Sequence, residues 1–240
     1  MSKAFTALGI LYLEHENKLC LDDEVKEYLP WLSLIYKGEY KGQRVDGEVP
    51  VTLKNLLYHT SGIPFETIGY IPEGNSDDML ESTVRNLIGV ELDFYPGQKY
   101  SYATINYDIL GLVIEVITDN CFEDFIMEKI CKPLGLSHTY LYRQEAQETG
   151  HLAKGYKTGF FQAWEYDAPE YRGNTPAGYV ISSIDDMARW MQIQMGMIDV
   201  PEPYAELIAR SHISDRTVTA VDDYSYAAGW NVHIRGEYLT

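Results

Sequence analysis

The chain has 240 residues, 45% of them apolar and 23% charged, a balance typical of a folded domain with a real core. Its 19 Lys and Arg residues against 36 Asp and Glu residues give a net charge of −17. This charge argues against nucleic acid or anionic lipid as a partner, because both present negative phosphates. No apolar run has the length of a membrane span, no signal peptide is visible, and the three widely spaced cysteines predict buried thiols.

Helical periodicity appears at the start of the chain, where Phe5, Leu8, Leu11 and Tyr12 share one face. The strongest helical pattern covers residues 105–118. Shorter helices are expected at 21–30, 51–57, 77–89, 122–129 and 184–195, the last of them capped by Ser183. Apolar alternation predicts a strand at 224–238, and we expect loops at 36–50 and 59–74 and an irregular aromatic region at 140–178.

The two ends of the chain favour a piece of a longer protein. The first helix begins without a capping residue, and the strand pattern at the other end runs to Thr240 without a partner strand. We therefore expect residues 1–240 to form a single incomplete domain.

Metal and cofactor sites are not indicated by the sequence. The six histidines lack the spacing of a zinc-binding helix, and no glycine-rich phosphate loop or Gly-x-Ser-x-Gly turn is present. The acidic pairs fall at expected helix starts or turns, where the helix dipole favours them. We predict no metal and no cofactor.

Several short motifs occur in a fixed order along the chain. They cover residues 2–8 (SKAFTAL), 59–64 (HTSGIP), 96–107 (PGQKYSYATINY), 110–111 (LG), 132–136 (KPLGL), 178–183 (GYVISS) and 186–189 (DMAR). Together they resemble the serine hydrolases of the class C β-lactamase, D-Ala-D-Ala carboxypeptidase and esterase group. The resemblance implies an α/β (α+β) fold, in which an antiparallel sheet flanked by helices adjoins a mostly helical lobe. We expect this chain to be mainly that lobe, with one or two strands near the C-terminus.

The resemblance also implies catalytic roles for two residues. Lys3 aligns with the lysine of the family's Ser-x-x-Lys motif, in which helical spacing brings the amine to the serine hydroxyl. The nucleophilic serine would then stand one residue before Met1, and Ser2, about 100° around the helix from Lys3, is no substitute. Tyr102 aligns with the tyrosine of the Tyr-x-Asn motif, which completes the proton relay.

Thr104 occupies the substrate-binding position where the family has Asn. A hydroxyl cannot offer the paired donor and acceptor of an amide, so the usual substrate contact is in doubt. Asn106 would compensate only if it faced the site, and helix geometry turns it away.

Three other features invite a catalytic interpretation that we do not adopt. Lys157-Thr158-Gly159 spells the family's third motif, but it precedes the Ser183 helix instead of following it, so the true motif is expected beyond Thr240. His59 and Ser61 belong to a structural turn. The aromatic residues Trp164, Tyr166 and Tyr171 line a cleft or pack on one another, and the sequence leaves both possibilities open.

Two functional hypotheses follow. In the first, the chain is an internal fragment of a serine hydrolase that acts on a small-molecule or peptide substrate through an acyl-enzyme, and the 240-residue chain itself is inactive. The substrate is a D-amino-acid peptide, a β-lactam, an acyl ester or an N-acyl-D-residue, and the resemblance implies an exported parent. In the second, the chain is a non-catalytic binding or scaffolding module of the same family.

Overall fold

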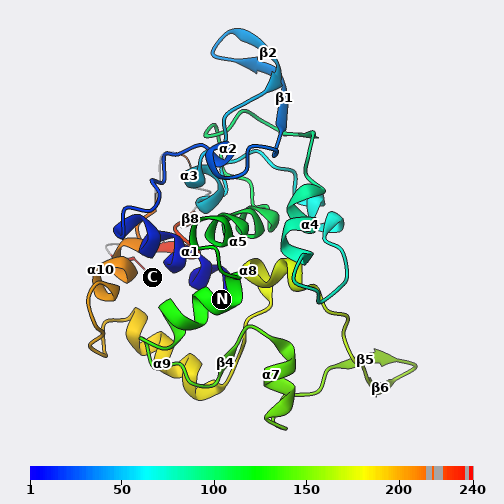
Figure 1. Ribbon diagram of the computed structural model, residues 1–240, viewed down its shortest axis with the longest axis vertical. Coiled ribbons are helices and arrows are strands. Elements are labelled where there is room, and N and C mark those ends of the chain that lie inside the picture. The colour runs from blue at the N-terminus through cyan, green and yellow to red at the C-terminus, as the bar shows by residue number, and fades with distance from the viewer. Residues whose placement is uncertain (215–217, 219–223, 236–237, 240) are drawn as a thin grey trace.

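A computed structural model describes residues 1–214, 218, 224–235 and 238–239 (Figure 1). The α-helices are α1 (Ser2–His15), α2 (Val25–Tyr28), α3 (Leu53–Leu57), α4 (Met79–Arg85), α5 (Ile105–Thr118), α6 (Phe122–Ile126), α7 (Arg143–Glu148), α8 (Thr175–Gly178), α9 (Ile184–Gln194) and α10 (Tyr204–Ser211). The 3-10 helices η1 (Phe65–Tyr70) and η3 (Arg172–Asn174) and the π-helical turn η2 (Met127–Cys131) complete the helical elements.

The strands form small sheets of two or three strands each. They are β1 (Leu34–Tyr40), β2 (Gln43–Glu48), β3 (Val90–Glu91), β4 (Thr139–Tyr140), β5 (Tyr156–Gly159), β6 (Gln162–Glu165), β7 (Ile181–Ser182), β8 (Tyr224–Tyr226), β9 (Asn231–Arg235) and β10 (Tyr238–Leu239). Their orders are β2-β1-β3, β10-β9-β8, β4-β7 and β5-β6, and every pair is antiparallel except β1 with β3.

Helices α1 and α5 form the centre of the core (Figure 1). The side chains of α1 are buried from Ser2 to Leu11, and those of α5 from Ile105 to Ile114, so neither helix has a solvent face over this length. Helices α6, α8 and α10 pack against α1, and Phe5 stacks on Trp190 of α9 with ring centroids 4.2 Å apart. The polar side chains on these helices are buried with the apolar ones, and Lys3, Thr6 and Asn106 make hydrogen bonds inside the protein.

Glycine allows α8 to lie directly on α5. A Cβ on Gly111 would stand 2.3 Å from Cγ of Pro176, so only a hydrogen fits there. Two side chains of α1 form hydrogen bonds to α8. The Thr6 hydroxyl donates to the Pro176 carbonyl at 2.6 Å, and Lys3 Nζ donates to the Ala177 carbonyl at 2.8 Å. Helix α8 is therefore fixed between the two central helices.

Several expectations from the sequence are confirmed. The strongest helical pattern corresponds to α5 with the same bounds, and α9 begins after Ser183, whose hydroxyl accepts from the Asp186 amide at 3.1 Å. Helices α3 and α4 lie inside the ranges predicted for them.

The expectation that strands would occur only near the C-terminus is wrong. The loop predicted at 36–50 is a hairpin of β1 and β2, closed by Lys41 and Gly42 with φ of 48° and 76°. Two residues with positive φ are what a tight hairpin turn requires. The region expected to be irregular at 140–178 contains α7, the β5–β6 hairpin and α8.

The single strand expected at 224–238 is a hairpin, because residues 227–230 connect β8 to β9.

The expectation that all three cysteines are buried is correct only for Cys131. Cys121 is half-buried, and Cys20, in the segment after α1, is exposed. Within the described residues, no helix combines the length and apolarity needed to span a membrane.

Candidate active site

The first turn of α1 places Lys3 inside the protein. Its side chain is 9% exposed, and its amine hydrogen-bonds the Ala177 carbonyl. The amine also lies 5.2 Å from the ring centre of Tyr102 and 5.6 Å from that of Tyr107, within the range of cation–π attraction. The two residues that the family resemblance assigns to proton transfer, Lys3 and Tyr102, are therefore neighbours.

Ser2 is directed away from this amine. Its hydroxyl accepts a hydrogen bond from the Val180 amide at 3.2 Å and is buried against the segment that follows α8. Ser2 thus anchors the same segment that Lys3 contacts. Within the 240 residues, no serine stands three residues before Lys3.

Tyr102 is held by aromatic neighbours. His59 packs against it with ring centroids 4.4 Å apart, and Tyr226 of β8 lies 4.6 Å from the same His59 ring. Burial, together with the positive charge of Lys3, holds the pKa of His59 well below its usual range, so this imidazole is neutral. Its Nδ1 accepts from the Ala103 amide at 3.4 Å, which fixes the chain beside Tyr102.

His59 and Ser61 stabilise the loop before α5, as expected of a structural turn. Ser61 donates to Oδ1 of Asn106 at 2.9 Å, and Asn106 Nδ2 lies 3.1 Å from His59 Nδ1. Asn106 is therefore buried in the core, where Ser61 and His59 are its partners, and it does not replace the missing amide at position 104. Thr104 is the N-cap residue of α5, is 8% exposed, and makes no side-chain capping bond.

The Lys157-Thr158-Gly159 sequence lies far from Lys3. It forms β5 of an exposed hairpin at the edge of the molecule, while the N-terminus lies beside α8 (Figure 1). The Lys157 amine stacks over the Tyr166 ring at 3.4 Å. This arrangement does not bring the sequence to the site.

Sequence reasoning missed Asp108, a fully buried carboxylate on α5. Burial raises its pKa well above the usual range, while the charge of Lys3 and the Ala177 amide lower it. The helical spacing could have predicted its burial. Asp108 falls three residues after Ile105 and four before Leu112, so it shares a helix face with two apolar residues that are both buried.

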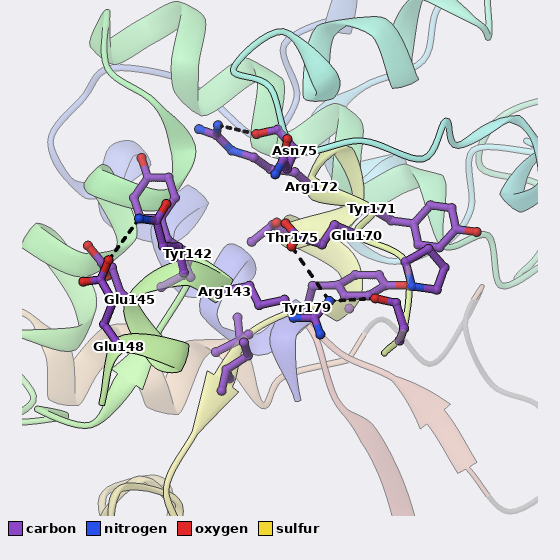
Figure 2. Close-up of a pocket in the computed structure, with 17 residues that line it drawn as sticks. Asn75, Tyr142, Arg143, Glu145, Glu148, Glu170, Tyr171, Arg172, Thr175 and Tyr179 are labelled. Atoms are coloured by element: carbon purple, nitrogen blue, oxygen red, sulfur yellow. Dashed lines mark hydrogen bonds and ion pairs between the residues drawn. The ribbon is translucent and has the colours of Figure 1, made fainter. Parts of the chain in front are cut away.

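A cavity of about 620 Å³ adjoins the segment that contacts Lys3 (Figure 2). Gly178, Val180 and Ile181 form one wall, and α7 with residues 168–172 forms the others. Its two arginines are already paired, Arg143 with Asp167 and Arg172 with Glu123 and Asp77. Tyr171 lines this cavity, which agrees with the interpretation that these aromatic residues line a cleft. Trp164, in contrast, is exposed on β6.

The fold and these motifs together define a protein of the serine β-lactamase and DD-peptidase fold. Among solved structures, one described as a class C β-lactamase superposes with a TM-score of 0.76 at 20% identity, covering 99% of this chain and 60% of that one. Because the identity is low, this likeness is evidence of the fold alone.

The family is shown by sequence. The Beta-lactamase family profile matches residues 1–238, and the chain belongs to this family. It is 31% identical over 231 residues to Protein flp of Staphylococcus aureus (strain MRSA252), covering 95% of this chain and 44% of that protein. It is 26% identical over 196 residues to a putative D-alanyl-D-alanine carboxypeptidase of Escherichia coli (strain K12), covering 78% and 40%. The chain thus spans less than half the length of these curated relatives.

Proposed function

We propose that the chain carries the lysine base and tyrosine partner of a serine hydrolase that cleaves amide or ester bonds through an acyl-enzyme. The observation that carries this proposal is the buried Lys3 amine over the Tyr102 ring at 5.2 Å. In such a site the serine oxygen attacks the substrate carbonyl and passes its proton to the neutral amine. The proton then leaves with the amine or alcohol group as its bond to the carbonyl carbon breaks.

The cavity beside Gly178 supports a substrate with a sizeable acyl substituent. Its arginines are paired within the protein, whereas Glu145 and Glu148 line it without a salt bridge among the described residues. An anionic substituent would meet uncompensated carboxylates there. The cavity therefore favours a neutral or amine-bearing acyl group, and D-amino-acid peptides, β-lactams and acyl esters all remain substrate classes of the proposal.

We further propose that the 240-residue chain alone forms no acyl-enzyme, because the position three residues before Lys3 lies outside it. The test compares three proteins: the chain itself, a variant with Met-Ser added before Met1, and that variant with Lys3→Ala. Each is exposed to a fluorophosphonate and a fluorescent penicillin, and labelled serines are located by mass spectrometry. Circular dichroism confirms that each protein is folded.

We expect labelling only at the inserted serine, and its loss in Lys3→Ala. Lys157→Ala serves as the matched control, because it removes a lysine from the hairpin remote from the site and leaves labelling unchanged. Serine labelling in the unextended chain would refute its inactivity. A folded extended variant that labels no faster than its Lys3→Ala counterpart would refute the role of Lys3, and the non-catalytic binding module would replace the hydrolase.

A further inference from the structure

The side chain of Tyr102 is held by ring contacts. It is half-buried in the loop before α5, and within the described residues it makes no hydrogen bond. Its aromatic neighbours in that part of the chain are His59, with ring centroids 4.4 Å apart, and Tyr226, with ring centroids 6.5 Å apart. The orientation of a phenol without a hydrogen bond is set by packing, so the nearer ring, that of His59, has the larger influence on it.

His59 also holds the backbone on both sides of Tyr102. Its carbonyl accepts from the Ser101 amide at 2.9 Å, and its imidazole Nδ1 accepts from the Ala103 amide at 3.4 Å. His59 therefore contacts three consecutive positions of the loop, the middle one through its ring. The ring of Tyr102 and the backbone that carries it are thus held by the same residue.

The orientation of the imidazole is fixed by a second donor. Nδ2 of Asn106 lies 3.1 Å from Nδ1, and Oδ1 of the same amide accepts from the Ser61 hydroxyl at 2.9 Å, so the amide nitrogen faces His59. A backbone N–H can only donate, and Nδ1 therefore carries no proton and accepts from both Ala103 and Asn106. Rotation of this fully buried ring would leave two buried donors without an acceptor, which is costly.

His59 adopts a backbone conformation that few residues accept. Its φ is 55°, in the left-handed region, where histidine and asparagine occur more often than most other residues with a side chain. Such conformations persist where the surrounding contacts require them, and here those contacts include the loop of Tyr102. The same φ suits asparagine, whose Oδ1 is attached to Cγ as Nδ1 is in histidine, so His59→Asn can keep the acceptor while it removes the ring.

We propose that His59 is a positioning residue for Tyr102: its carbonyl and Nδ1 fix the backbone on either side, and its ring holds the phenol beside the Lys3 amine. That amine lies 5.2 Å from the centre of the Tyr102 ring. His59 acts through Tyr102 and transfers no proton itself. The chemical relevance of this inference rests on the proposed hydrolase function, whereas the position of the ring can be measured without it.

The position of Tyr102 is measured by NMR in the 240-residue chain. Nuclear Overhauser effects are compared from the Lys3 side chain to the Tyr102 ring and to the Tyr107 ring, with Lys3→Arg, Tyr102→Phe and Tyr107→Phe for assignment. The two ring centres lie 5.2 and 5.6 Å from the amine. Tyr107 is held separately, because its hydroxyl donates to the Leu57 carbonyl at 2.9 Å. The effect to Tyr107 is therefore an internal reference.

We expect His59→Ala, which removes both the ring and the acceptor, to abolish the effect between Lys3 and Tyr102 and to keep that between Lys3 and Tyr107. His59→Asn, which restores the acceptor, should give an intermediate effect. Ile193→Ala is the matched control, since it truncates a buried side chain of α9 and should keep both effects. An unchanged effect to Tyr102 in folded His59→Ala, or its equal loss in Ile193→Ala, would overturn the proposal.

His59→Asn decides the question if His59→Ala does not fold. A weaker effect between Lys3 and Tyr102 than in the wild-type chain supports the proposal, and an effect of wild-type strength overturns it. In the serine-extended chain, His59→Asn should slow fluorophosphonate labelling by about tenfold, because misplacement of a catalytic group is costly, while Ile193→Ala should keep the rate. A displaced Tyr102 with unchanged labelling would refute the catalytic role of Tyr102 and support its positioning by His59, so the two failures are distinguishable.

Discussion

Replacement of Gly111 by alanine is predicted to destabilise the protein, although helix propensity argues for the opposite. Gly111 lies inside α5, where alanine is favoured over glycine by about 1 kcal/mol. The new Cβ, however, would stand 2.3 Å from Cγ and 2.8 Å from Cβ of Pro176. Carbon atoms pack best at about 3.5–4.0 Å, so the overlap exceeds an ångström.

The clash cannot be relieved by a rotamer change. Pro176 is a rigid ring, and its carbonyl is bound by Thr6 while the next carbonyl is bound by Lys3. Helix α8 would have to move away from α5, and overpacking of this kind costs about 1–3 kcal/mol. Set against the propensity gain of about 1 kcal/mol, the expected net loss is about 1 kcal/mol. The shift would also lengthen the hydrogen bond of Lys3 to Ala177.

Urea unfolding of three glycine variants checks this reasoning. At Gly9 in α1 the nearest atoms to an added Cβ are ends of flexible side chains, with Ile126 Cδ1 at 2.9 Å, so Gly9→Ala should cost less than Gly111→Ala. Gly69 has nothing within 4 Å, and Gly69→Ala should be neutral or slightly stabilising. If Gly111→Ala matches Gly69→Ala in unfolding free energy, the close approach of α8 to α5 does not limit that position.

Three further predictions concern stability. Thr52→Ala removes the hydroxyl that accepts from the Asn55 amide at 3.2 Å and should cost about 1 kcal/mol in urea unfolding, whereas an unchanged midpoint would show that the cap is not needed. Phe5→Ala empties the fully buried position stacked on Trp190 and should cost about 3–5 kcal/mol, measured in the same way; a loss below 1 kcal/mol would mean that the core closes over the gap. Burial raises the pKa of Glu115 from 4.5 to about 7. The carboxyl group therefore ionises at lower pH in the unfolded chain than in the folded protein. As a result, Glu115 lowers the free energy of unfolding progressively as the pH rises from 4.5 to about 7. Glu115→Gln should therefore gain stability relative to wild type as pH rises through that window, and a pH-independent difference between the two would contradict the assignment.

Sequence periodicity identified the helices whose apolar residues recur at helical spacing and contact the core. The pattern at 105–118 gave α5 with its bounds, because its apolar spacing reports a core contact. The β1–β2 hairpin was missed for the converse reason. Most of its side chains are partly or fully exposed, so no apolar alternation marks it, and the turn at Lys41-Gly42 was the remaining signal.

The candidate site could be predicted only where a motif existed. Lys3 and Tyr102 came from the resemblance to a family, and their catalytic roles remain predictions although the two side chains are neighbours. Asp108 was not identified, because a lone acid between apolar residues becomes meaningful only when α8 is known to pack beside it. Its partners, Asn174 and Ala177, lie more than 60 positions along the chain, and no local pattern connects them.

The Ala177 peptide joins the two central helices to the site, so the packing of α8 and the proposed chemistry depend on the same segment. Gly111 determines how closely α8 approaches α5, and the Ala177 carbonyl of α8 accepts the hydrogen bond of the Lys3 amine. Gly111→Ala should therefore lower the unfolding free energy and, in the serine-extended chain, slow fluorophosphonate labelling, because it moves the peptide that binds the amine. Gly69→Ala, at a position with no atom within 4 Å of an added Cβ, should leave the labelling rate unchanged. If Gly111→Ala lowered stability without slowing the labelling, the position of α8 would not determine the position of the amine, and the link through Ala177 would be wrong.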